Sequence, residues 1–128
     1  MDVAAWLEAY RVAWERRDPD AAADLFADAS TYRANIFEDP FEGTDGVRRY
    51  WADVTASQSD VEVRIGRPYV DGDRVAAEFW TTMRVAGDEV TLPGCLFLRF
   101  DGAGRCTSLH EYWQFQPERT DPPPEWGS

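Results

Sequence analysis

Three turn signals divide residues 61–115 into four short segments, and this division constrains the fold more than any other feature of the sequence. The signals lie at residues 71–73, 87–88 and 101–104, and each combines glycine with aspartate. Apolar and charged residues alternate from Val61 to Ile65, which is the period of a strand with one buried face. Short alternating segments joined by tight turns predict four antiparallel strands connected as hairpins.

The chain before residue 61 has a helical period instead. Apolar residues recur every three or four positions from Val3 to Trp14 and again from Val47 to Val54. Asp18-Pro19 is typical of the start of a further helix, because Asp can cap the first turn and Pro fits its first position. Helices followed by a meander of strands predict an α+β domain over residues 1–116. Residues 117–128 contain three consecutive prolines and are predicted to be an extended or disordered tail.

Composition excludes several classes of function. The net charge of −11 without a lysine-rich block argues against binding to nucleic acid or to an anionic membrane. No apolar run reaches ~18 residues and no signal sequence opens the chain, so a soluble, cytoplasmic protein is expected. Cys95 and Cys106 are expected to be free thiols. The chain has one histidine, which cannot form a metal site of the usual kind, and no cofactor is expected.

The last segment, residues 105–115, places one carboxylate among apolar side chains. In a strand, Thr107, Leu109, Glu111 and Trp113 share a face. The last two turns predict that Phe79 pairs with Leu96 and Leu96 with Leu109. They also predict that Thr81, Gly94 and Glu111 form one layer. A glycine in this layer would leave empty volume beside the carboxylate. Pro93 cannot donate to a ladder, and a bulge is expected there, which would alter the register before it.

Four stretches of the chain resemble a known family. Residues 13–20 read Ala-Trp-Glu-Arg-Arg-Asp-Pro-Asp, and residues 24–32, 41–51 and 100–113 follow in the same order. Together they resemble the SnoaL-like branch of the nuclear transport factor 2-like superfamily. The resemblance implies a cone-like curved antiparallel sheet packed on three N-terminal helices, enclosing an apolar pocket. Members include ketosteroid isomerase-like, cyclase-like and dehydratase-like enzymes, and binding modules without catalytic activity.

The resemblance also carries over some site positions. The oxyanion-donor tyrosine of the ketosteroid isomerases falls on Tyr10, their base falls on Ala34, and their aspartate donor falls on Leu96. Two of the three groups are missing, so steroid isomerase chemistry is not expected. Trp113 matches a pocket tryptophan of that group, while Glu111 stands where the group has a small apolar residue.

Glu111 has two interpretations. It is a structural carboxylate bonded to a side chain of the first helix or paired with an arginine, or it is a general acid or base whose burial raises its pKa towards neutrality. In the second case Tyr10 and Tyr32 are candidate hydrogen-bond donors to an oxyanion. Otherwise they are core residues with satisfied hydroxyls. The pocket lining is expected to comprise Trp14, Trp51, Phe79, Thr81, Met83, Gly94, Leu96, Leu109 and Trp113.

The other face of the sheet is expected to carry a partner. His110 is predicted to point away from the pocket, and it shares the outer face with Trp80, Phe97 and Tyr112. An exposed aromatic patch indicates an interface, and a homodimer is the expected assembly.

The sequence therefore leaves three functions open. The first is a cofactor-free isomerase, cyclase or dehydratase that acts on a hydrophobic carbonyl compound by proton transfer. The second is a non-catalytic module that binds a hydrophobic small molecule. The third is a dimerising structural domain with a filled interior.

Overall fold

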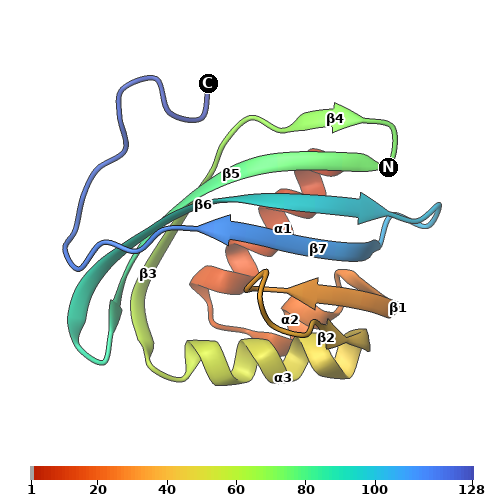
Figure 1. Ribbon diagram of the computed structural model, residues 1–128, viewed down its shortest axis with the longest axis horizontal. Helices are drawn as coiled ribbons and strands as arrows, with labels where there is room; N and C mark the ends of the chain where they lie inside the picture. The colour runs from red at the N-terminus through yellow and green to blue at the C-terminus, as the bar shows by residue number, and fades with distance from the viewer. Residues whose placement is uncertain (1) are drawn as a thin grey trace.

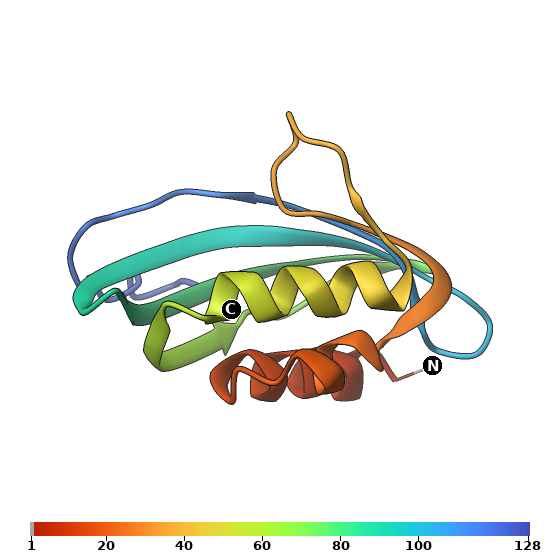
Figure 2. The ribbon, with the colours of Figure 1, turned by 90° about the horizontal axis from the view of Figure 1, so that it is seen from below.

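A curved seven-stranded sheet lies on one side of three helices (Figures 1 and 2). The computed structural model describes residues 2–128. The helices are α1 (Val3–Glu15), α2 (Pro19–Ala23) and α3 (Gly43–Thr55). The strands are β1 (Phe26–Arg33), β2 (Phe41–Glu42), β3 (Gln58–Ile65), β4 (Tyr69–Asp71), β5 (Arg74–Val85), β6 (Asp88–Phe100) and β7 (Cys106–Trp113).

The sheet has the strand order β2-β1-β7-β6-β5-β3, and β4 pairs with β5. All pairs are antiparallel except β1 with β7. The predicted α+β cone-like fold is confirmed. Four strands were predicted over residues 61–115, and the structure has five, because Gly66-Arg67-Pro68 separates β3 from β4. Beyond β7 the sheet continues with the eight-residue strand β1 and ends at the two-residue strand β2, and the loop between β1 and β2 projects from the molecule (Figure 2).

Helix α2 begins where the sequence indicates. Asp18 caps α2 by accepting a hydrogen bond of 3.1 Å from the backbone N–H of Ala21, and Pro19 occupies the first turn. The buried face of α1 carries Trp6, Tyr10 and Trp14 at intervals of four residues, so three aromatic rings lie in line against the sheet. Among residues 2–128 no helix is long and apolar enough to cross a membrane.

The strand pairing keeps the predicted faces but moves the predicted layers. Leu96 lies opposite Glu111 rather than Leu109, and Leu109 lies opposite Leu98. A register shift between Arg99 and Phe100 accounts for one residue of this difference, and a turn one residue longer than expected accounts for the other. Because each pairing moves by two residues, every side chain stays on its predicted face, and Glu111 points inward.

The β5–β6 hairpin differs from the prediction in the same way. Its turn is Ala86-Gly87, both with positive φ, rather than Gly87-Asp88. Phe79 therefore pairs with Gly94, and Thr81 pairs with Leu92. The predicted layer of Thr81, Gly94 and Glu111 is wrong. The expected bulge at Pro93 is also absent, because the β5–β6 ladder runs without a shift from residue 74 to residue 85.

Residues 117–128 lie against the outer face of the sheet, along the left side of Figure 1. The indole N–H of Trp80 donates to the carbonyl of Thr120 at 3.0 Å, and its ring meets the ring of Trp126 at 5.9 Å between centroids. The guanidinium of Arg64 lies 5.3 Å from the centre of the Trp126 ring. The segment bends at residues 117–118 and turns at 124–127, and it forms no helix or strand. The sequence did not predict these contacts.

Candidate functional site

Strand β7 places the carboxyl group of Glu111 inside the fold. Glu111 is the inward residue between Leu109 and Trp113, and its nearest strand neighbour is Leu96 on β6. The residue is only 7% exposed. Burial raises the pKa of Glu111 to about 8, and burial is the one cause of the shift: no hydrogen bond or cation among the described residues offsets it. At neutral pH the carboxyl is therefore mostly protonated.

Two tyrosines, brought together from α1 and β1, lie beside this carboxyl. The hydroxyl groups of Tyr10 and Tyr32 are 2.9 Å apart, and both residues are fully buried. Burial raises the pKa of both tyrosines well above its usual value, and the charge of Glu111 adds to the effect. Both hydroxyls stay protonated at any ordinary pH. Since only one proton is used in their mutual hydrogen bond, the other O–H can donate elsewhere.

Tyr50 completes the polar cluster, and the sequence reasoning did not select it. It lies on α3, its ring centre is 4.7 Å from that of Tyr32, and burial and then Glu111 raise its pKa. Its place beside Trp51 on the apolar stripe of α3 indicated burial. What the sequence could not indicate is that α3 crosses β1 at Tyr32.

Aromatic rings pack around the cluster from three elements. Trp51 of α3 meets Tyr10 at 5.7 Å, and Trp14 of α1 meets both Trp51 and Phe79 at 5.5 Å between ring centres. These are edge-on contacts, which aromatic pairs favour. The rings that were expected to line a pocket therefore touch one another. Among the described residues, the indole N–H of Trp51 and the hydroxyl of Thr81 are buried without a hydrogen-bond partner.

Gly94 does not leave open space beside Glu111. A Cβ atom at Gly94 would lie 2.4 Å from the Phe79 ring and 2.5 Å from the carbonyl oxygen of Tyr112. The missing side chain is thus replaced by the ring of Phe79, which lies directly across the strand pair. The empty volume expected beside Gly94 is therefore filled.

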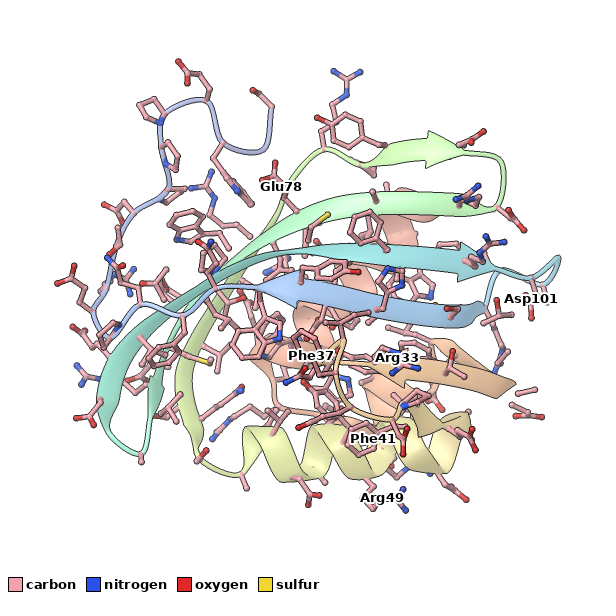
Figure 3. The ribbon with its side chains drawn as sticks, in the orientation of Figure 1. Arg33, Phe37, Phe41, Arg49, Glu78 and Asp101 are labelled. Carbon is pink, nitrogen blue, oxygen red and sulfur yellow. The ribbon has the colours of Figure 1, made fainter. Side chains whose placement is uncertain are left out.

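The remaining predicted lining residues divide between core and rim. Leu96, Leu109 and Thr81 are buried in the sheet's inner face, and Met83 is 7% exposed. Trp113 is 43% exposed and its indole N–H donates to the carbonyl of Ala34 at 2.7 Å. Trp113 therefore lies at the rim, where it joins β7 to the loop between β1 and β2. Figure 3 shows Phe37 on that loop, and its side chain is almost wholly exposed.

The sequence profile of the family described as SnoaL-like domain matches residues 5–109. The chain belongs to this family. A comparison with curated proteins finds no match.

Solved structures similar to this SnoaL-like domain share its fold. One is a hypothetical protein with a ketosteroid isomerase-like fold from Catenulispora acidiphila DSM 44928, in complex with trimethylamine. It is 27% identical, has a TM-score of 0.76, and the match covers 84% of this chain and 83% of that one. A second is SalBIII, described as an epoxide hydrolase/cyclase-like enzyme in pyran ring formation in the polyether salinomycin. It is 19% identical, with a TM-score of 0.75 and coverage of 87% and 89%.

A third is an LEH-like epoxide hydrolase of M. tuberculosis. It is 22% identical, has a TM-score of 0.71, and the match covers 86% of this chain and 80% of that one. Below 25% identity these likenesses concern the fold alone.

Several hollows of this SnoaL-like domain lie away from Glu111. Five are pronounced, and none is lined by Glu111, Tyr10 or Tyr32. One of them, with a volume of about 390 Å³, lies on the outer face of the sheet.

His110 points to that outer face, as predicted. Its ring stacks on Phe97 at 5.1 Å and meets Tyr112 edge-on at 5.7 Å. Burial and the charge of Arg33 lower the pKa of His110. Cys95 and Cys106 are free thiols, as predicted. Among residues 2–128, no group of three potential ligands is arranged to hold a metal ion.

Proposed function

We propose that this SnoaL-like domain binds a hydrophobic carbonyl compound in its interior and moves a proton on it without a cofactor. The reaction would be that of an isomerase, cyclase or dehydratase. The observation that carries the proposal is Glu111, a buried carboxyl with no hydrogen-bond or charge partner among the described residues and a pKa of about 8. A proton-transfer group works best when its pKa lies near the working pH.

The chemistry uses Glu111 in both protonation states. The carboxylate removes the proton from the carbon next to the carbonyl group, and the electron pair of that C–H bond forms an enolate. The free O–H of the Tyr10–Tyr32 pair donates to the enolate oxygen as its charge develops. The protonated Glu111 then returns the proton to another carbon in an isomerase, or to a departing hydroxyl group in a dehydratase. No electrons leave the substrate and no co-reactant is required.

Binding in the interior requires the aromatic rings to part. The substrate would enter beside Trp113, because this exposed residue lies two positions from Glu111 on the same face of β7. Its link to the β1–β2 loop is one hydrogen bond, to Ala34. The description of SalBIII as an epoxide hydrolase/cyclase-like enzyme and the M. tuberculosis epoxide hydrolase support a catalytic use of the fold, although not a particular substrate.

The test follows exchange of a carbon-bound proton. α-Tetralone in D₂O serves as a hydrophobic ketone, and NMR measures the loss of its protons next to the carbonyl. The wild type is expected to accelerate this exchange, the Glu111→Gln variant to abolish the acceleration, and Tyr10→Phe to reduce it by tenfold or more. Folding of each variant is checked by circular dichroism. Acceleration that persists in a folded Glu111→Gln protein contradicts the proposal.

A second candidate function is binding without catalysis, with an amine as the ligand. It is favoured by the aromatic rings around a lone carboxyl and by the trimethylamine in the C. acidiphila structure. An ammonium ion would pair with Glu111 and lie against ring faces. Trimethylamine would then raise the melting temperature of the wild type but not of Glu111→Gln, and the neutral isostere tert-butanol would raise neither. Equal shifts with both compounds would refute this candidate.

We also propose a homodimer through the outer-face cluster of Phe97, His110 and Tyr112, which is partly exposed. Trp80, the fourth residue predicted for this interface, contacts the tail of its own chain instead. Sedimentation velocity on the wild type and on Tyr112→Asp tests the proposal. The variant is expected to be a monomer, and a monomeric wild type would contradict the proposal.

A further inference from the structure

Two neighbouring rows of residues cross the outer face of the sheet at the end that carries β4. The first row is Tyr69, Ala76, Phe97 and His110, and each residue lies directly opposite the next on adjacent strands. The second row is Asp71, Arg74, Arg99 and Ser108, paired in the same manner. Together these eight residues account for most of the lining of the 390 Å³ hollow. Its volume is in the range of small-molecule sites.

The first row forms a slot with aromatic walls. Adjacent strands lie about 4.8 Å apart, so the backbones of Tyr69 and Phe97 are roughly 10 Å apart across Ala76. A planar ring stacked between two aromatic rings needs roughly 7 Å, so the spacing admits one ring. The Phe97 ring is held nearly parallel to His110 on its far side, at an angle of 9°. Its other face is therefore presented to the slot, with the small Ala76 as the floor.

The second row brings two positive charges to one end of the slot. Arg74 and Arg99 lie directly opposite each other on β5 and β6, and like charges in this arrangement destabilise a strand pair. No acidic group of the described residues forms an ion pair with either guanidinium. Asp71 lies at the end of the same row, opposite Arg74, without such a contact. In a chain with a net charge of −11, two adjacent arginines without an acidic partner among the described residues make a local positive field that attracts an anion.

We propose that this hollow binds a flat aromatic carboxylate. The ring would lie between Tyr69 and Phe97 above Ala76, and the carboxylate would receive hydrogen bonds from Arg74 and Arg99. Arginine suits this role because its planar guanidinium can donate two parallel hydrogen bonds to one carboxylate. The site lies on the opposite face of the sheet from Glu111, and it does not depend on the proposed function of the interior. Phe97 and His110 belong to the proposed dimer cluster as well as to the lining of the hollow, and the slot lies on the β4 side of the Phe97 ring.

Naphthoate is the probe, and the uncharged naphthamide is its matched control. Titration followed by NMR is expected to show saturable shifts of the backbone amides around Ala76 and Phe97 with naphthoate, and binding at least tenfold weaker with naphthamide. The variants Arg74→Gln and Arg99→Gln are each expected to weaken naphthoate binding about tenfold. Ala76→Leu fills the floor of the slot and is expected to abolish it.

Two further variants separate this site from others. Arg49→Gln removes one exposed positive charge from α3, away from the hollow (Figure 3), and is expected to leave the affinity unchanged. Glu111→Gln is expected to leave it unchanged as well, so failure of the interior proposal would not affect this one.

Three results would overturn the proposal: equal affinity for naphthoate and naphthamide, equal loss in Arg49→Gln and Arg74→Gln, or amide shifts confined to the interior. Sedimentation velocity covers the remaining case. If Ala76→Leu converts a dimer to a monomer and naphthoate does not bind the wild type, a second copy of the chain occupies the hollow, and the proposal is wrong.

Discussion

The buried carboxyl of Glu111 should make the domain less stable as pH rises from 5 to 8. Its pKa is raised from 4.5 to about 8 in the folded protein. Between these values the folded state holds a proton that the unfolded state has released. The free energy of unfolding therefore falls by about 1.4 kcal/mol for each pH unit in this window. Over the whole window the loss is roughly 5 kcal/mol, and the contribution of Glu111 is fully present only below pH 4.5.

The Glu111→Gln variant isolates this effect, because an amide of the same shape does not titrate. Urea unfolding is followed by tryptophan fluorescence for both proteins at half-unit steps from pH 5 to pH 8.5. As pH rises, the unfolding free energy of the variant should increase by several kcal/mol relative to that of the wild type. His110 acts in the opposite direction, since burial and Arg33 lower its pKa, but its contribution is common to both proteins and cancels in the difference.

A difference that stays constant from pH 5 to pH 8.5 would refute the reasoning, because it would place the pKa of Glu111 near its usual value. That result would require a hydrogen-bond or charge partner for the carboxylate in solution. It would also remove the basis for assigning proton transfer at neutral pH to this group.

Three further predictions concern packing. Gly94→Ala should lower the unfolding free energy by about 3 kcal/mol or more, because the new methyl group would overlap the ring of Phe79. Chemical denaturation measures this loss of stability, and an unchanged unfolding free energy would show that the ring can move aside. Tyr32→Phe should cost about 1–3 kcal/mol by leaving the buried hydroxyl of Tyr10 without its partner, and an unchanged melting curve would contradict the hydrogen bond. Trp126→Ala should release the tail from the sheet, which limited proteolysis would detect as cleavage within residues 117–128 of the variant but not of the wild type.

The sequence predicted the faces of the strands better than their layers. The inward position of Glu111 and the outward position of His110 follow from alternation, which a shift of two residues leaves intact. The layer of a residue depends on the exact turn, and the positive φ of Ala86 could not be read from an alanine, which rarely adopts it. The glycine that was expected to make a void instead receives the Phe79 ring, because the layer was misplaced.

Contacts between distant segments were the other part that the sequence could not supply. The apolar stripe of α3 predicted that Tyr50 and Trp51 are buried, but not that they meet Tyr32 from β1. The tail offered only its prolines, which indicate an extended chain. The position of the tail on the sheet depends on individual hydrogen bonds. The hydroxyl of Thr91, for example, donates to the carbonyl of Glu118 and accepts from the N–H of Thr120. No local pattern marks such pairings.

Burial of the Glu111 carboxyl lowers the free energy of unfolding, and this loss of stability bears on the role of the residue. The neighbouring row of the inner face, Val75, Leu98 and Leu109, is wholly apolar, and a leucine at position 111 would extend this packing. Within residues 2–128 the carboxyl has no partner that compensates for its burial, so Glu111→Leu should raise the unfolding free energy at pH 7 by about 2–4 kcal/mol, as measured in urea. The same variant should lose the exchange activity on α-tetralone. Active sites commonly exchange stability for activity, so the proposed role in proton transfer or binding accounts for a buried acid at such a cost. If Glu111→Leu is instead less stable than the wild type, the carboxyl supports the fold, and the proposal of a catalytic interior loses its principal observation.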